Sequence, residues 1–354
     1  MRWDLFCRVV DNFGDIGVCW RLACQLARRG EQVRLWVDDA SALAWMAPGT
    51  PPAGVELRRW CEPWDDPLDD VVPHEVVIEA FGCDPPPAFV AAMHRAVPPV
   101  WINLEYLSAE RYAERSHGLL SPQLSGPGAG LQKWFFYPGF SDRSGGLLRE
   151  PELAARQAAF DSERWCDAQG LATRPGERRV SLFCYPSAPV SALAEQLARE
   201  PTLLVLTASA PTVEPRPSLR CVRLPWLSQH EFDHLVWSCA LNFVRGEDSL
   251  VRALWAGRPF LWQLYPQHDQ AHAAKLAAFA ERFGSAGVPG LDAFWQAWNG
   301  LAPWPATLPL QGPAWSAWQQ AASRFSEEQR AWPDLATRLQ AFVHGRGAGP
   351  SAPA

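Results

Sequence analysis

Lysine is almost missing from this chain of 354 residues, and so is any excess of positive charge. Only Lys133 and Lys275 stand among its 32 lysine and arginine side chains, a bias that we interpret as codon usage. The formal net charge is −6. Non-specific binding to nucleic acid relies on a positive surface, so this balance does not support it, and we expect no nucleic-acid partner.

The chain also lacks the usual signatures of secretion, membrane insertion and structural zinc. Its nine cysteines are odd in number, include no CxxC pair and mostly stand in apolar runs, which favours reduced thiols over disulfides or zinc. No apolar run reaches the length of about 20 residues that crosses a membrane, and no basic start precedes a short apolar stretch. We therefore expect a cytoplasmic protein without a membrane partner. The length predicts two domains, and a content of 48% hydrophobic residues predicts full cores.

What the chain does carry is a strand–helix–strand–helix pattern between residues 241 and 276. An apolar strand at 241–244 breaks at Arg245 and Gly246, and a helix follows with Glu247, Asp248 and Ser249 in its first turn. A Gly-Arg-Pro stop at 257–259 precedes a second strand at 260–264 and a helix opened by residues 268–270. Unpaired N–H groups and the helix dipole make such a helix start a seat for phosphate. The alternative is that the two acids only cap the helix.

The first residues predict a βαβ unit with an acidic loop. A strand at 3–10 is followed by a loop at 11–17, a helix at 18–29 closed by Gly30 and a strand at 33–37. Gly14 and Gly17 lack the third glycine of a dinucleotide fingerprint, and Asp15 would repel a pyrophosphate, which argues against NAD or FAD. Asp11 and Asp15 are either a turn former with a helix N-cap, or a carboxylate pair for proton transfer.

The rest of the first half is predicted as scaffold with two open points. Strands are expected at 76–81 and 100–104, and helices at 86–96 and 108–116. Tyr106, after the second of these strands, is either a core residue or part of a frame for an acceptor. The Gly- and Pro-rich segment 121–146 is either an interdomain crossing or a loop facing the acceptor.

In the second half the pattern predicts strands at 180–185, 203–206 and 221–224 and a helical stretch at 152–171. Ser228 is the expected N-cap of a helix that runs to residue 238, with Glu231 completing a capping box. His268, Asp269 and His272 have a spacing that suits a metal, but no further ligand stands nearby, so we expect capping and donor contacts from them rather than a metal.

Two motifs resemble those of one known family. The stretch VVDNFGDIGVCWRLA at 9–23 and the GEDS stretch at 246–249, preceded by Phe243-x-Arg245, are similar to signatures of the bacterial protein-arginine rhamnosyltransferases that modify elongation factor P. The resemblance implies an α/β protein of the GT-B class, with two Rossmann-like domains facing each other across a cleft. It also implies an acceptor-binding domain at 1–145, a nucleotide-sugar-binding domain at 146–325, a helix at 326–343 returning to the first domain and a flexible tail at 344–354.

The function that this resemblance implies is inverting transfer of rhamnose from dTDP-β-L-rhamnose to an arginine of elongation factor P, in support of the translation of proline-rich stretches. The nucleotide-sugar and elongation factor P would be the partners, and neither a cofactor nor a metal would be needed. The implied catalytic residues are Asp11, Asp15 and Glu247. The implied donor-binding residues are Asn12, Phe13, Gly14, Phe183, Tyr185, Gln229, Phe232, Arg245, Gly246, Glu247, Asp248 and Ser249. The alternatives are a GT-B enzyme with another nucleotide-sugar and a glycan or lipid acceptor, and a GT-B-like protein that only binds a partner.

Overall fold

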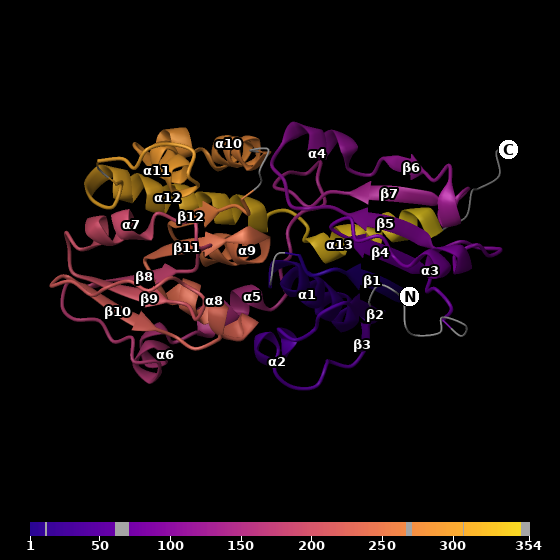
Figure 1. The fold of residues 1–354 in the computed structure, drawn as a ribbon, viewed down its shortest axis with the longest axis horizontal. Helices are drawn as coiled ribbons and strands as arrows, with labels where there is room; N and C mark the ends of the chain where they lie inside the picture. The colour runs from indigo at the N-terminus through magenta and orange to yellow at the C-terminus, as the bar shows by residue number, and fades with distance from the viewer. Residues whose placement is uncertain (11–12, 61–70, 267–270, 307, 348–354) are drawn as a thin grey trace. The chain divides into compact units, whose positions relative to one another are not determined.

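A computed structural model describes residues 1–10, 13–60, 71–266, 271–306 and 308–347. The chain divides into two compact units, each built around one sheet (Figure 1). Unit 1 comprises residues 1–44, 48–150 and 332–354, and unit 2 comprises residues 45–47 and 151–331. The chain passes from the first unit to the second after Glu150, five residues beyond the boundary expected at 145.

Unit 1 contains a seven-stranded sheet in the order β3-β2-β1-β4-β5-β7-β6. All neighbours are parallel except β6 and β7. Parallel strands are covered on both faces and therefore read as continuous apolar runs, as the five buried residues of β4 illustrate. The strands are β1 (Arg2–Cys7), β2 (Gln32–Val37), β3 (Val55–Arg59), β4 (Val76–Ala80), β5 (Val100–Leu104), β6 (Leu120–Pro122) and β7 (Gln132–Phe136).

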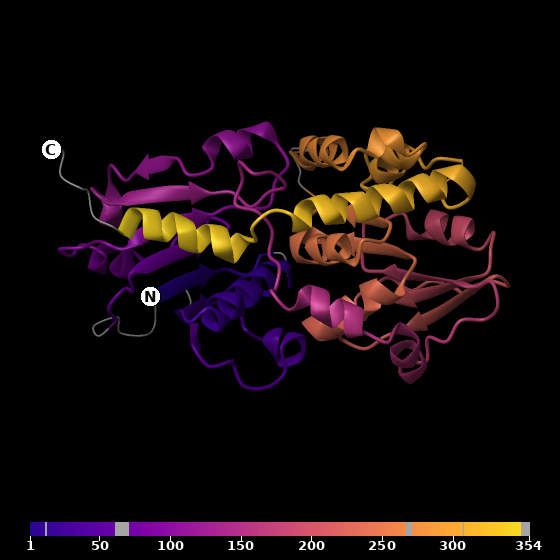
Figure 2. The same ribbon diagram turned by 180° about the vertical axis from the view of Figure 1, so that it is seen from behind.

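The helices of unit 1 complete its core. The long helix α1 contacts β1, β2 and β3, and α13 contacts α1 and β5. Both helices pack along the sheet of unit 1, as Figure 2 shows. A second cluster, next to α3, is aromatic: Phe6 stacks on Trp36 with ring centroids 5.5 Å apart, and Phe89 meets Phe6 edge-on at 4.8 Å. The helices are α1 (Gly14–Arg28), α3 (Pro87–Ala92), α4 (Arg111–Ser116), the 3₁₀ turn η2 (Gly126–Gly128) and α13 (Leu335–Gly347); α2 (Leu43–Met46) spans the point where the units meet in sequence.

Two expectations for unit 1 were wrong, and one strand was missed. Helix α1 begins at Gly14 rather than at residue 18. Residues 14–17, which were assigned to a loop because of their two glycines, form its first turn. The segment 121–146 is not one continuous loop, since it carries most of β6 and all of β7, whose pairing in the sheet overrides the Gly- and Pro-rich flanks. Strand β3, with its alternating exposure, was not recognised at all.

Unit 2 contains a five-stranded parallel sheet in the order β10-β9-β8-β11-β12. Helices α6 and α8 share an apolar cluster with β9, and α9 contacts α8 and α12 as well as β11 and β12. The strands are β8 (Arg178–Leu182), β9 (Thr202–Leu206), β10 (Leu219–Arg223), β11 (Leu241–Arg245) and β12 (Phe260–Gln263). The helices are α5 (Leu153–Ala159), α6 (Ser162–Ala168), α7 (Val190–Leu197), α8 (Gln229–Ser238), α9 (Gly246–Ala256), α10 (Ala271–Phe283), the 3₁₀ turn η3 (Ser285–Gly287), α11 (Leu291–Trp298) and α12 (Gly312–Arg330).

Local chemistry was predicted best in unit 2. Ser228 caps α8 and forms a capping box with Glu231, and Gly257 ends α9 with a φ of 64°, which a glycine adopts without strain. The expected helix at 152–171 is instead two helices, because Asp161 caps a new start for α6. Residues 326–343 do not form one continuous helix: α12 ends at Arg330 in unit 2, and α13 is a separate helix of unit 1, the unit to which this helix was expected to return.

Candidate active site

The strand order places the predicted residues at the point of each sheet where ligands are usually bound. The order reverses between β1 and β4 in unit 1 and between β8 and β11 in unit 2. Open α/β sheets bind ligands outside the carboxyl ends of the strands at such a switch point. In unit 2 the segments that follow β8 and β11 hold Phe183, Tyr185 and residues 246–249. In unit 1 the segment after β1 leads to Asp15.

The first turn of α9 is fixed by two of the predicted residues. Gly246 has a φ of 65°, a conformation that favours glycine where strand β11 turns directly into the helix. The Ser249 hydroxyl accepts the Arg245 backbone N–H at 3.1 Å and donates to the Arg245 carbonyl. Glu247 and Asp248 lie in this turn, as predicted. The backbone of this turn is therefore fixed, and its N–H groups and the positive end of the helix dipole are available to an anion.

Arg245 contacts two aromatic residues that follow β8. Arg245 is 8% exposed, and its guanidinium lies 4.5 Å from the Phe183 ring centroid and 4.6 Å from that of Tyr185. It also donates to the Cys184 carbonyl at 3.3 Å. A planar, delocalised cation stacks well on aromatic rings, so Arg245 orients both rings. Phe232 of α8 meets Phe183 edge-on with centroids 5.6 Å apart. The structure thus brings these four predicted residues together.

Burial raises the pKa of the neighbouring Cys184 thiol to about 12. Cys184 therefore remains a neutral thiol near pH 7 and is unsuited to act as a nucleophile in this site. None of the eight cysteines in the described part of the chain forms a disulfide.

A buried ion pair, which the sequence did not indicate, joins the two helices that carry donor-binding candidates. Asp233 of α8 accepts from Nε of Arg252 at 2.6 Å and from its Nη2 at 2.8 Å. Arg156 of α5 adds a contact at 3.3 Å. Asp233 is fully buried and Arg252 is 1% exposed. Because Gln229 and Phe232 lie on α8, the pair fixes them relative to the first turn of α9.

Three further residues of β12 and α10 support the same region and were missed. Trp262 Nε1 donates to the Gly246 carbonyl at 2.7 Å, and Lys275 Nζ lies 2.7 Å from a carboxylate oxygen of Glu247. Gln263 accepts the Tyr185 backbone N–H at 2.8 Å. No local sequence pattern could reveal these contacts, because each joins residues at least sixteen positions apart.

Asp15 lies in the first turn of α1 and is 3% exposed. Its carboxylate accepts the Val10 backbone N–H at 2.9 Å, while Asp38, at the end of β2, accepts the Val9 N–H at 2.9 Å. The N-cap position of α1 belongs to Phe13, and Gly14 is the first helical residue, so the interpretation of Asp15 as N-cap is wrong. Asp15 instead holds the segment that leads out of β1.

Asp11 and Asn12, the other predicted residues of this loop, lie outside the described residues. The proposed pairing of Asp11 with Asp15 therefore remains a prediction from the sequence.

The carboxyl end of β4 carries a feature that sequence reasoning missed. Phe81 has a φ of 59°, a conformation that bulky side chains rarely adopt. Its ring stacks on Tyr106 with centroids 4.7 Å apart and an interplanar angle of 19°. Tyr106 is 39% exposed, so the interpretation as a core residue is wrong. Strained backbone often accompanies functional sites, and here it presents an aromatic pair at the same sheet edge as Asp15.

Neither a metal site nor a membrane span is found in the described parts of the chain. No three metal-ligating side chains come together among the residues that the structure describes. His272 lies on α10, whereas His268 and Asp269 fall outside those residues. Across the described residues, no helix combines the length and the apolar character that spanning a bilayer requires.

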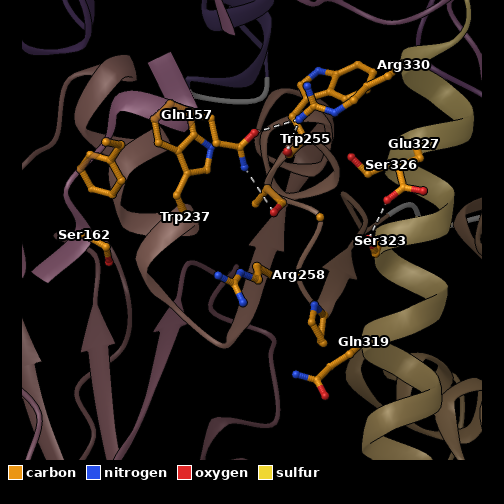
Figure 3. A pocket seen from close by; sticks show the side chains of 14 residues that line it. Gln157, Ser162, Trp237, Trp255, Arg258, Gln319, Ser323, Ser326, Glu327 and Arg330 are labelled. Carbon is orange, nitrogen blue, oxygen red and sulfur yellow. Dashed lines mark hydrogen bonds between the residues drawn. The ribbon is translucent and has the colours of Figure 1, made fainter. Parts of the chain in front are cut away.

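A cavity of about 560 Å³ lies at the opposite end of α9 (Figure 3). There Arg330 donates to the Trp255 carbonyl at 2.7 Å and to the Gln157 side chain at 2.9 Å. The lining includes residues 257–259, which lead into the amino-terminal end of β12. This cavity is therefore at the wrong edge of the sheet to be the ligand site defined by β8 and β11.

Two Rossmann-like units, each with candidate ligand-binding residues at its switch point, define the GT-B class of glycosyltransferases. Solved glycosyltransferases share the fold. One is the spinosyn rhamnosyltransferase SpnG, with a TM-score of 0.54 and 14% identity, covering 97% of this chain and all of that one. Another is WaaG, a glycosyltransferase of lipopolysaccharide biosynthesis, with a TM-score of 0.52 and 12% identity over 99% and 100% of the two chains. The chain thus has the GT-B fold that these glycosyltransferases share.

Sequence comparison narrows this class to one family. Residues 3–344 match the family described as elongation factor P (EF-P) rhamnosyltransferase EarP. The protein-arginine rhamnosyltransferase of Pseudomonas aeruginosa is 44% identical, with 96% of this chain and 98% of the relative covered. A solved structure described as the structural basis for EarP-mediated arginine glycosylation of EF-P has a TM-score of 0.60 and 29% identity, over 98% and 99% of the two chains. The chain belongs to the EarP family.

Proposed function

We propose that this enzyme transfers rhamnose from dTDP-β-L-rhamnose to an arginine side chain of elongation factor P. The observation that carries the proposal is the cluster around Arg245 at the switch point of unit 2, in a chain that belongs to the EarP family. The relatives' name, protein-arginine rhamnosyltransferase, supports the sugar and the acceptor group.

In this proposal unit 2 holds the donor. The diphosphate is seated at the first turn of α9, where N–H groups and the helix dipole favour negative charge. Arg245 adds a positive charge that is already desolvated, which strengthens its interaction with an anion. Gln229 and Phe232 of α8, with Phe183, receive the thymine base through hydrogen bonding and ring contacts.

Unit 1 serves the acceptor. An arginine guanidinium has a pKa above about 12 and is a poor nucleophile as long as it is fully protonated. A carboxylate that binds the guanidinium and accepts its proton makes a nitrogen lone pair available, which is the role that we assign to Asp15, with Asp11 sharing it. The Phe81–Tyr106 pair offers a flat face on which a guanidinium can stack.

The bond changes balance without a cofactor. The acceptor nitrogen attacks the anomeric carbon as the bond from that carbon to the β-phosphate oxygen breaks, and dTDP leaves with the bonding electron pair. The guanidinium proton passes to the carboxylate. A single displacement of this kind inverts the anomeric configuration. Arg245 and the α9 helix start stabilise the charge of the leaving diphosphate, so we propose that no metal is required.

The test combines the purified protein with elongation factor P and dTDP-rhamnose and measures the intact mass of the acceptor. A gain of one deoxyhexose on an arginine, unchanged in EDTA, is expected. Parallel reactions with dTDP-glucose and with UDP-sugars should give no product. Transfer that requires a divalent metal, or that occurs only to a glycan or lipid acceptor, would contradict the proposal.

A further inference from the structure

Both lysines of the chain occupy the same kind of surroundings, although they belong to different units. Lys133 of β7 lies 2.7 Å from a carboxylate oxygen of Glu79 and 4.7 Å from the ring centroid of Trp101. Its side chain is 14% exposed, and that of Glu79 is 1% exposed. Lysine thus occurs where a compact ammonium group is held between a carboxylate and an indole ring.

Lys275 repeats this arrangement beside the proposed donor site. Its Nζ lies 2.7 Å from a carboxylate oxygen of Glu247 and 6.0 Å from the ring centroid of Trp262. Its side chain is 21% exposed, and that of Glu247 is 17% exposed. Trp262 Nε1 in turn donates to the Gly246 carbonyl. The ammonium of α10 and the indole of β12 therefore hold two successive residues of the same helical turn.

The charge of Glu247 makes this contact matter for donor binding. A carboxylate in the turn that receives a diphosphate repels that diphosphate, unless a nearby cation neutralises it. Lys275 supplies the cation from the neighbouring helix α10, and at 2.7 Å it also fixes one oxygen of the carboxylate. A held carboxylate can direct its other oxygen at a sugar hydroxyl, whereas a free one samples several rotamers.

We propose that Lys275 is a positioning residue for the transfer reaction, which holds and neutralises Glu247 in the first turn of α9. This inference rests on the proposed function, because it takes that turn as the diphosphate site. Lysine is the suitable cation here, since its ammonium is a compact point charge, whereas a guanidinium is a wide planar fork.

Two substitutions separate charge from geometry. Lys275→Met removes both, so we expect the Kd for dTDP to rise and kcat to fall, each by about 10–100-fold, the range for losing a charged hydrogen bond. Lys275→Arg retains the charge but changes the shape. The Kd for dTDP should then stay within about threefold of the wild-type value, as surface-charge contacts tolerate some displacement, while kcat still falls about tenfold or more. A lysine with a purely structural role would not give a variant whose Kd for dTDP is nearly unchanged while its kcat falls.

The chain offers a matched control. Lys133→Arg makes the same exchange in the same kind of surroundings in unit 1, and it should leave the Kd for dTDP and kcat unchanged. A second control is the Glu247→Gln background, in which Lys275→Met should cost less than about threefold further, because coupled residues are not additive. Thermal unfolding of each variant identifies those that are folded at the assay temperature, and Lys275→Gln replaces Lys275→Met if the latter is not.

The outcomes also distinguish this inference from the function on which it rests. Lys275→Met with wild-type Kd and kcat, or with an equal loss in the Glu247→Gln background, would overturn the role of Lys275 alone. Wild-type protein that binds dTDP but does not modify elongation factor P would overturn the proposal that elongation factor P is the acceptor. The Kd values of the Lys275 variants for dTDP, measured by calorimetric titration, would still decide the role of Lys275. Failure of the wild-type protein to bind dTDP would overturn both.

Discussion

The ion pair between Asp233 and Arg252 gives the sharpest test of how the proposed donor site is built. Two hydrogen bonds of 2.6 and 2.8 Å join a fully buried carboxylate to an arginine that is 1% exposed. Asp233→Asn keeps the shape but leaves the Arg252 charge buried without its counter-ion. Breaking one partner of such a pair typically costs about 3–5 kcal/mol. For a unit of this size, that corresponds to a fall in Tm of about 6–20 °C.

Replacing both partners has a different expected result. Asp233→Leu combined with Arg252→Met removes two buried charges at similar volume, a change that is often neutral or stabilising. Arg156, the third member, is 22% exposed and can turn its guanidinium to water. We therefore expect the double variant to recover to within about 1.5 kcal/mol of the wild-type free energy of unfolding.

Stability and donor affinity should then separate. Without the pair, α8 loses its buried charged contact with α9, and Gln229 and Phe232 are placed less accurately. We expect the Kd for dTDP to be about tenfold higher in the stable double variant, the equivalent of about one hydrogen bond.

Urea unfolding followed by tryptophan fluorescence measures the stability, hydrogen exchange at α8 measures its local opening, and calorimetry measures dTDP binding. A double variant that stays as unstable as Asp233→Asn would refute the energetic argument. One that is stable and binds dTDP like the wild type would refute the positioning role.

Three further predictions concern single residues. Asp15→Asn should keep dTDP binding but lower single-turnover transfer to elongation factor P by about 10²–10⁴-fold, because the amide oxygen still accepts the Val10 N–H but no longer accepts a proton; near wild-type transfer would remove the catalytic role. Arg245→Ala should weaken calorimetric dTDP binding by about 1.5–3 kcal/mol through loss of a charged contact, and an unchanged affinity would place the diphosphate elsewhere. His117 has its pKa lowered to about 4 by burial, with Arg338 and Arg346 adding to the effect. The unfolded chain thus takes up a proton near pH 6.5 that the folded chain accepts only near pH 4, so stability is full above pH 6.5 and falls as the pH drops through that window. After allowance for partial exposure we expect His117 to account for a loss of about 1–2 kcal/mol in urea unfolding between pH 7.5 and pH 5, so the loss should be smaller by that amount in His117→Gln; an equal loss in that variant would assign it to other groups.

The sequence predicted those features that depend on a few neighbouring residues. The capping box of Ser228 and Glu231 and the left-handed end of α9 at Gly257 follow from hydrogen bonding and steric freedom within one turn. The GEDS turn after β11 was also placed correctly. Here the local preference and the tertiary structure agree, so pattern alone was sufficient.

Features that depend on distant residues were not predictable in this way. Strand β7 follows a Gly- and Pro-rich stretch and is a strand because β5 and β6 pair with it. The contact of Lys275 with Glu247 spans 28 positions. Phe81 adopts a conformation that its own side chain disfavours, so no propensity could indicate it. A single sequence does not reveal which distant groups will meet, and the supporting residues of the site are of this kind.

The separation of α12 from α13 has a consequence for the order in which the protein folds during synthesis. Residues 332–347 belong to unit 1, where Leu339 and Val343 are fully buried and Arg338 donates to the Asp142 carbonyl. The sequence of unit 2 is complete at Ala331, before these residues have been made. Domains generally fold as their chains emerge, amino-terminal part first. In this protein unit 1 instead gains its last core residues only when α13 has been made, so a chain that ends near residue 331 contains all of unit 2 but lacks the helix that completes the core of unit 1.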